Sequence, residues 1–157
     1  MKLSSIIQSL KDALDLNRKQ ILHIYQLQDY AMDEKRLDAI LKNPSKKSAK
    51  EASYEELGLF LDGLFEYKRG EKPTIPEDAE IELDNNLVLK KIRSALNLKE
   101  YEIAMIFELA DFKISKSQIK DMFRSSNHPK LKICDNKTLN AFLEGLKEFY
   151  YDSGEYL

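Results

Sequence analysis

Apolar residues recur at helical spacing along almost the whole chain. In the segment 86–96, Val88 and Ile92 fall on one side of a helix, whereas Lys90 and Lys91 fall on the other. No segment alternates apolar and polar residues over the length of a strand, so the pattern predicts an all-α protein. In the first half of the chain the same spacing predicts helices over residues 3–15, 18–28, 33–42 and 54–68.

This helical pattern occurs twice. Moving the first half forward by 82 residues places Ala13 on Ala95 and Asp29 on Asp111 without a gap. Most apolar positions are kept while the polar positions have diverged, as expected when two copies share one packing scheme. We therefore predict two tandem four-helix repeats that pack together with pseudo-symmetry.

The boundary between the copies lies where proline and acidic residues interrupt the helical pattern. Pro73 and Pro76 both fall in this segment, and proline is poorly tolerated inside a helix. We predict repeat 1 over residues 1–69, a linker over residues 70–84 and repeat 2 over residues 85–157.

A glycine occupies the same place in the last apolar stripe of each copy. Gly63 and Gly145 lie inside predicted helices, where glycine costs about 1 kcal/mol of helix propensity. Its occurrence at both positions predicts a close crossing with another helix, a packing role that implies no ligand. Ser53 and Glu56 have the spacing of a capping box at the start of the first of these helices.

The composition excludes several classes of protein. An apolar share of 43% in 157 residues is enough for a core, and a net charge of −2 gives no global attraction to nucleic acid or anionic lipid. The N-terminal residues lack the apolar core of a signal peptide, and no apolar run approaches the ~20 residues that span a bilayer. With a single cysteine, these features favour a cytoplasmic protein without disulfides.

Three segments carry a resemblance to a known family. They are the run 85–95, the segment 60–64 with the following 68–70, and residues 142–146. Together they resemble the YehS-like family, a bacterial family of duplicated helical domains of unknown function. The resemblance covers nearly the whole chain. It implies a small cytoplasmic bacterial protein with two helical repeats and no established catalytic residue, cofactor or substrate.

Repeat 2 is locally basic. Lys116, Lys120 and Arg124 follow one another at intervals of four, which places them on one face of a helix that Ser115 would cap. Such a face either binds phosphates, as in a helix-turn-helix protein, or is simply solvated; the equivalent residues of repeat 1 include two acids, which favours solvation. The candidate nucleic-acid residues are Lys90, Lys91, Arg93, Lys116, Lys120, Arg124 and Lys132.

The remaining chemically active residues favour structural roles. His128 lacks a metal-ligand partner nearby in the sequence, and His23 aligns with a methionine, which predicts a packing position. Cys134 aligns with an alanine, so we expect a small buried side chain there. Asp29 and Asp111 follow predicted helices in both copies, where we expect their carboxylates to cap the next turn; an acid/base pair across the pseudo-twofold axis is the less favoured alternative. No catalytic residue, metal site or cofactor is predicted.

The aromatic residues near the ends of the last helices suggest a partner surface. Phe65, Tyr150 and Tyr151 fall partly off the apolar stripes and are candidates for an exposed patch that contacts a protein partner or a second copy of the chain. No small-molecule substrate or membrane contact is inferred. The sequence favours a non-catalytic interaction or regulatory module that binds another macromolecule, with nucleic-acid binding through repeat 2 as the alternative.

Overall fold

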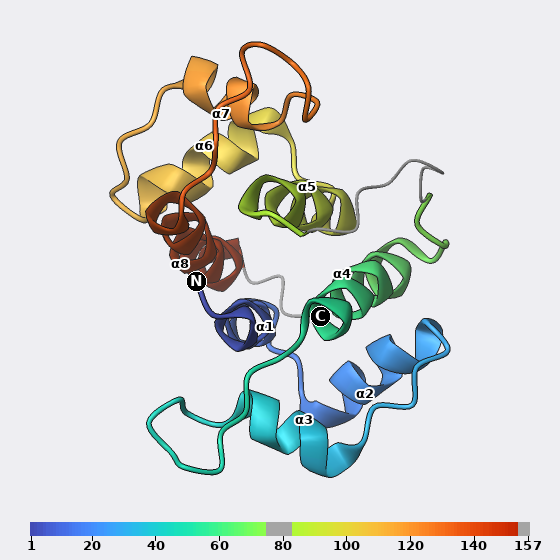
Figure 1. Ribbon diagram of the computed structural model, residues 1–157. Helices are drawn as coiled ribbons and strands as arrows, with labels where there is room; N and C mark the ends of the chain where they lie inside the picture. The colour runs from blue at the N-terminus through green and yellow to red at the C-terminus, as the bar shows by residue number, and fades with distance from the viewer. Residues whose placement is uncertain (75–82, 154–157) are drawn as a thin grey trace.

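The computed structural model describes residues 1–74 and 83–153, and all regular structure in these residues is helical (Figure 1). The all-α prediction is therefore confirmed, and each helix of repeat 2 begins 82 residues after its counterpart. Most of the predicted linker, residues 75–82, lies outside the described residues. The helices are α1 (Leu3–Ala13), α2 (Arg18–Leu27), α3 (Glu34–Leu41), α4 (Tyr54–Arg69), α5 (Asn85–Leu96), α6 (Glu100–Leu109), α7 (Lys116–Met122) and α8 (Asn136–Ser153).

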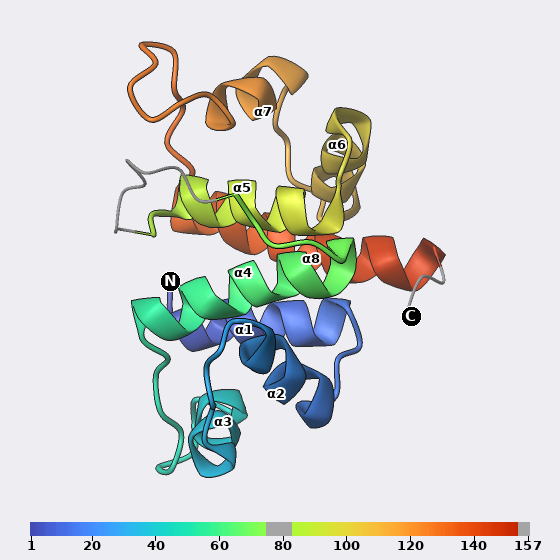
Figure 2. The same ribbon diagram turned by 90° about the vertical axis from the view of Figure 1, so that its right-hand side faces the viewer.

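Four helices, two from each repeat, form the centre of the molecule. α1, α4, α5 and α8 run side by side in the same direction, while α2–α3 and α6–α7 lie on opposite sides of them (Figure 2). The main contacts in this layer join the repeats, α4 to α5 and α1 to α8, whereas α1 and α4 of the same repeat touch much less. The buried side chains of both repeats consequently form one core.

One outer helix of each repeat, α2 or α6, is fixed to the central layer by an equivalent aromatic contact. Tyr25 of α2 packs on Phe60 of α4 with ring centroids 6.0 Å apart, and Phe107 of α6 packs on Phe142 of α8 at 5.7 Å. All four side chains are fully buried. The pseudo-symmetry therefore extends from the sequence to the packing of the outer helices.

The two glycines make the close crossings that their positions predict. A Cβ atom on Gly63 would collide with the carbonyl oxygen of Ile24 in α2, and one on Gly145 would collide with the carbonyl oxygen of Ile106 in α6. Because the equivalent backbone group is approached in both repeats, the glycines set the distance between the outer and central helices.

The parallel arrangement brings four helix N-termini together at one end of the bundle. Their positive dipole ends are balanced by carboxylates. Ser53 and Glu56 form the predicted capping box of α4, Asp84 accepts from the Leu87 N–H at 2.8 Å, and Asp135 caps α8 through the Thr138 N–H. The Lys2 side chain does not cap α1; Glu51 of the loop before α4 accepts from the Ser4 N–H at 2.7 Å instead.

A polar residue in the first turn of α1 and α5 holds the extended segment before the last helix of its repeat. Ser4 Oγ accepts from the Ala52 N–H at 2.7 Å and donates to the Lys50 carbonyl, and Asn86 Oδ1 accepts from the Cys134 N–H at 2.9 Å. Ala52 and Cys134 are 4% and 2% exposed, which confirms the small buried position expected there.

Residues with a left-handed backbone conformation follow the first two helices of each repeat. Asp15 and Asn97 have φ of 51° and 53°, and Asp29 and Asp111 have φ of 55° and 53°. Asp and Asn tolerate this conformation better than most residues. The expected capping role of Asp29 and Asp111 is wrong, because Asp33 and Ser115 cap the next helices. Their backbone conformation accounts for both acids. They follow α2 and α6, two helices that lie on opposite sides of the molecule (Figure 2).

We expect Gly63→Ala and Gly145→Ala each to destabilise the protein by about 2 kcal/mol or more, because the collision with a carbonyl group exceeds the gain in helix propensity. Gly58→Ala is the matched control in α4. Its Cβ would lie 3.4 Å from Leu83 Cδ1, an ordinary contact, so we expect a small stabilisation. Urea denaturation followed by circular dichroism measures all three; equal effects at Gly58 and Gly63 would contradict the crossing.

We expect neither half of the chain to fold alone as a monomer, because separation of the halves removes the main contacts of α4 and α1 within the central layer, which are with α5 and α8 of the other repeat. Residues 1–74 and 83–157 should each show no cooperative thermal transition in isolation, while the mixture recovers one. A cooperative monomeric transition of either half would show that the repeats are independent domains.

Candidate functional site

The outer face of α2 forms a hollow with the start of α3. Its volume is about 640 Å³, within the range of ligand-binding clefts. Leu22, Tyr30 and Met32 line it with apolar surface, and His23 and Lys19 add polar groups. The hollow is open to solvent, so it is a surface groove.

Repeat 2 has hollows at the corresponding place. Two depressions of about 390 and 490 Å³ lie between α6 and α7, lined by Ala104, Phe112 and Ile114, which occupy the positions of the apolar lining residues of repeat 1. The duplication has therefore kept a concave surface on the outer side of each repeat. These two surfaces are the candidate functional site.

The charges that border this surface are exchanged between the repeats. Arg18 of α2 pairs with two acids of α3, the nearer being Asp38 at 2.9 Å. In repeat 2, Glu100 stands at the position of Arg18, and Lys116 and Lys120 stand at the positions of the two acids. Glu100 and Lys116 line the same hollow. In repeat 2 the acid thus lies on α6 and the two lysines lie on α7, so the signs of these charges are reversed relative to repeat 1, while Arg124 lies beyond the end of α7.

An exposed apolar stripe runs along α6. Tyr101, Met105 and Leu109 are 65%, 46% and 38% exposed and follow one another at intervals of four, so they lie along one face. The equivalent positions of α2 are Lys19 and His23, followed by a leucine. Both His23 and Met105 are exposed, so the packing role predicted for them is wrong. Repeat 2 has an apolar outer face where repeat 1 has a polar one.

Several of the seven basic candidates of repeat 2 contact groups of the protein near the end of α7, while Lys91 contacts the other repeat. Lys90 Nζ donates to the carbonyl of Arg124 at 2.6 Å, and the guanidinium of Arg93 lies 4.7 Å from the ring centre of Phe123. Lys91 Nζ pairs with Asp62 of α4 at 2.7 Å, across the contact between the repeats.

Only part of the predicted basic stripe is freely exposed. Arg124 pairs with Asp121 at 2.7 Å and is half-buried, as is Lys132, while Lys116 and Lys120 are exposed. Lys90, Lys91, Arg93 and Arg124 thus make contacts within the protein. Of the seven residues, Lys116 and Lys120 are exposed and the other five are half-buried.

The aromatic candidates do not form an exposed patch. Tyr150 is only 7% exposed, so its assignment to such a patch is wrong. Phe65 is half-buried and lies under the Arg69 guanidinium, 5.3 Å from it. Tyr151 is 73% exposed. The other exposed large apolar residues among those described are on α6 and at the N-terminal end of the bundle, where Tyr54 and Ile133 are 60% and 70% exposed.

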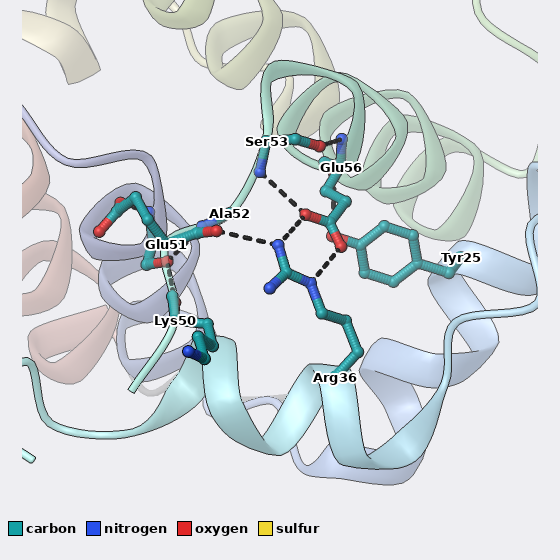
Figure 3. A network of polar contacts seen from close by, with 8 residues as sticks. Tyr25, Arg36, Lys50, Glu51, Ala52, Ser53 and Glu56 are labelled. Atoms are coloured by element: carbon teal, nitrogen blue, oxygen red, sulfur yellow. Dashed lines mark hydrogen bonds and ion pairs between the residues drawn. The ribbon is translucent and has the colours of Figure 1, made fainter. Parts of the chain in front are cut away.

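A partly buried ion pair joins the outer helix α3 to the central helix α4 in repeat 1. Arg36 of α3 makes two parallel contacts with Glu56 of α4, at 2.7 and 2.9 Å, and also donates to the carbonyl of Glu51 (Figure 3). The Tyr25 hydroxyl donates to the Glu56 carbonyl, and the Ser53 N–H donates to its carboxylate. The Glu56 side chain is 7% exposed and the Arg36 side chain 34%, so the carboxylate is buried while the guanidinium stays partly open to water.

Repeat 2 lacks this network. Phe107, Gln118 and Thr138 occupy the positions of Tyr25, Arg36 and Glu56, and Gln118 caps its own helix together with Ser115. Because one repeat dispenses with the ion pair, the fold does not require it. The groups that the pair contacts belong to α2, α3, α4 and the loop before α4, so we regard it as a structural link between α3 and α4.

The histidines and the cysteine have local partners. His128 Nδ1 accepts from the Lys130 N–H at 3.0 Å, and the His23 ring meets the edge of Tyr67. Burial raises the pKa of the Cys134 thiol to about 12, which leaves it as an unreactive thiol. Within residues 1–74 and 83–153, no group of three metal-binding side chains is found, and no helix is long and apolar enough to cross a bilayer.

Sequence reasoning overlooked the α6 stripe, although the spacing of Tyr101, Met105 and Leu109 contains the signal. In a helix with buried residues on the other side, three apolar positions at intervals of four indicate a second apolar face. The Arg36–Glu56 pair had no comparable signal, since nothing in the sequence specifies contact between residues 20 apart.

Comparison with known proteins identifies two matched segments. A family model described as "Protein of unknown function (DUF1456)" matches residues 5–70 and again residues 85–150. The chain is 29% identical to the uncharacterized protein YehS of Escherichia coli (strain K12) over 144 residues, which cover 91% of this chain and 92% of the relative. No solved structure matches. The matched segments coincide with the two repeats, and the resemblance seen in the sequence is confirmed.

We expect Arg36→Gln to destabilise the protein by about 2 kcal/mol at pH 7, because it leaves the buried Glu56 carboxylate without its counter-ion. The double variant Arg36→Gln/Glu56→Thr, which carries the residues of repeat 2, should recover part of this loss. Urea denaturation of the wild type, both singles and the double measures the coupling; additive losses would show that the two side chains act independently.

The stabilisation by this pair should depend on pH. The Arg36 guanidinium, hydrogen-bonded to Glu56, holds the pKa of that carboxyl below its ordinary value of 4.5. The contribution is therefore complete above pH 4.5 and is lost as the pH falls through the lower folded value. Denaturation at pH 7 and near pH 3 should show a smaller difference between the wild type and the double variant in acid.

Proposed function

The chain belongs to the family of proteins of unknown function DUF1456, and from its own surface we propose that it is a non-catalytic interaction module that binds another macromolecule. One observation carries this proposal: the exposed apolar face of α6, which lies beside the hollows between α6 and α7. Exposed apolar residues that gather on one face commonly mark an interaction site. The core shared by the two repeats offers a rigid support for such a face.

Nucleic-acid binding through repeat 2 is the alternative proposal. Lys116 and Lys120 are exposed on α7 and support it. The acids of the neighbouring α6 and the internal contacts of Lys90 and Lys91 oppose it, because both reduce the positive charge available to phosphates. We therefore favour a protein partner.

The proposal predicts a complex in the cells that produce the protein. A photo-crosslinking residue at Tyr101, and separately at Lys19 and at Lys120, should give at least one discrete adduct in the native host, and the tagged chain should sediment in lysate faster than its 18.3 kDa monomer. Nuclease treatment separates a nucleic-acid partner from a protein partner. A monomer that forms no adduct at any of the three positions contradicts the proposal.

A further inference from the structure

We propose that the exposed face of α6 is the docking surface and that its occupant is a basic amphipathic helix of another protein. This inference rests on the proposed function and specifies its site and its partner. The α6 face is defined by Tyr101, Met105 and Leu109 together with the acids Glu100 and Glu108.

The apolar part of the α6 face has the dimensions of a helix-binding site. Tyr101 and Leu109 are eight residues apart, which is about 12 Å along the helix axis, a little over two turns. A partner helix that places apolar residues at positions i, i+3 or i+4 and i+7 covers the same length. The neighbouring depressions, lined by Ala104, Phe112 and Ile119, provide concave apolar surface for its side chains.

The charge of the α6 face selects a basic partner. The helix carries three acids and no lysine or arginine, and Asp111 follows it with an exposed side chain. Lys113 and Lys116 line the hollows from the side of α7, and Lys99 and Lys120 are exposed nearby, but on α6 itself the charged residues next to the apolar stripe are acids. Lysine or arginine residues flanking an apolar stripe would be attracted to this border, whereas phosphates and anionic lipids would be repelled. The acids around α6 are Glu100, Glu102, Glu108 and Asp111.

A second copy of the chain fits this face less well. The outer helix equivalent to α6 is α2, which carries the basic residues Arg18, Lys19 and His23. Arg18 is already paired with acids of α3, and none of the exposed large apolar side chains among the described residues is on α2. Packing α6 against α6 of another copy would bring like charges together. A different protein supplies both the apolar stripe and the positive charge.

A labelled model peptide tests the chemistry. We would use a helical peptide of about 18 residues with leucine at the apolar positions and lysine elsewhere, a version with glutamate in place of lysine, and a scrambled lysine version. Fluorescence anisotropy with the full chain should show the basic amphipathic peptide binding at least about tenfold more tightly than the other two, with weaker binding at higher salt. Equal affinity for the three peptides overturns the proposal.

Variants of the full chain locate the binding. Met105→Ser and the double Glu100→Lys/Glu108→Lys should each weaken binding of the basic peptide at least about tenfold. The controls are Ile133→Ser, a more exposed apolar residue elsewhere, and Glu55→Lys/Glu71→Lys, which changes the net charge equally and also alters the first turn of a helix. Circular dichroism verifies that all four fold. Equal losses in variants and controls overturn the assignment to α6.

The same variants separate this inference from the proposed function. Loss of the cellular complex with the α6 variants, but not with the controls, supports the docking surface. A cellular protein complex that persists unchanged in the α6 variants overturns the docking surface and leaves the proposed function standing. Concentration-dependent dimerisation of the pure chain that Met105→Ser abolishes would assign the face to a second copy and overturn the proposed partner.

Discussion

The contact between the repeats, α4 against α5 and α1 against α8, is the constraint from which the rest of the structure follows. It buries the apolar faces of four parallel helices in one core, so neither repeat has a complete core of its own. Because these helices run in the same direction, each repeat needs a connection that returns to the starting end. The outer pairs α2–α3 and α6–α7 are these connections (Figure 2).

The outer helices are held in position by their contacts with the central helices. At Gly63 and Gly145 the central helices approach the carbonyl groups of Ile24 and Ile106 so closely that no side chain fits, and a buried aromatic pair supports each crossing. With its inner side fixed in this way, the outer side of each pair is free to change. The exchanged charges around α2 and α6, and the apolar stripe on α6 alone, are the results of such divergence.

Because the inner contacts of the outer helices are kept while their outer surfaces vary, the two repeats share a fold although their surfaces suggest different roles. The polar network around Arg36 and Glu56 links α3 to α4 in repeat 1, whereas repeat 2 joins its corresponding helices without an ion pair. A role carried by the α6 face therefore belongs to one copy, and the other copy contributes support. Duplication supplied a stable framework on which one outer surface changed.

The sequence by itself determined the helices, the duplication and the glycine crossings, because these depend on spacing and on side-chain size at fixed positions. It also determined that position 134 asks for a small buried residue, through its alignment with Ala52. Only the tertiary structure decided which groups the long polar side chains contact. Lys91 reaches Asp62 across the repeats, a contact that depends on a helix far away in the sequence. The burial of Tyr150, by contrast, follows from its spacing, because it lies four residues after Leu146 and continues the apolar stripe of α8. The tertiary structure also decided which face of α6 is exposed, since the sequence of a helix with apolar residues on both sides does not reveal which side the core will cover.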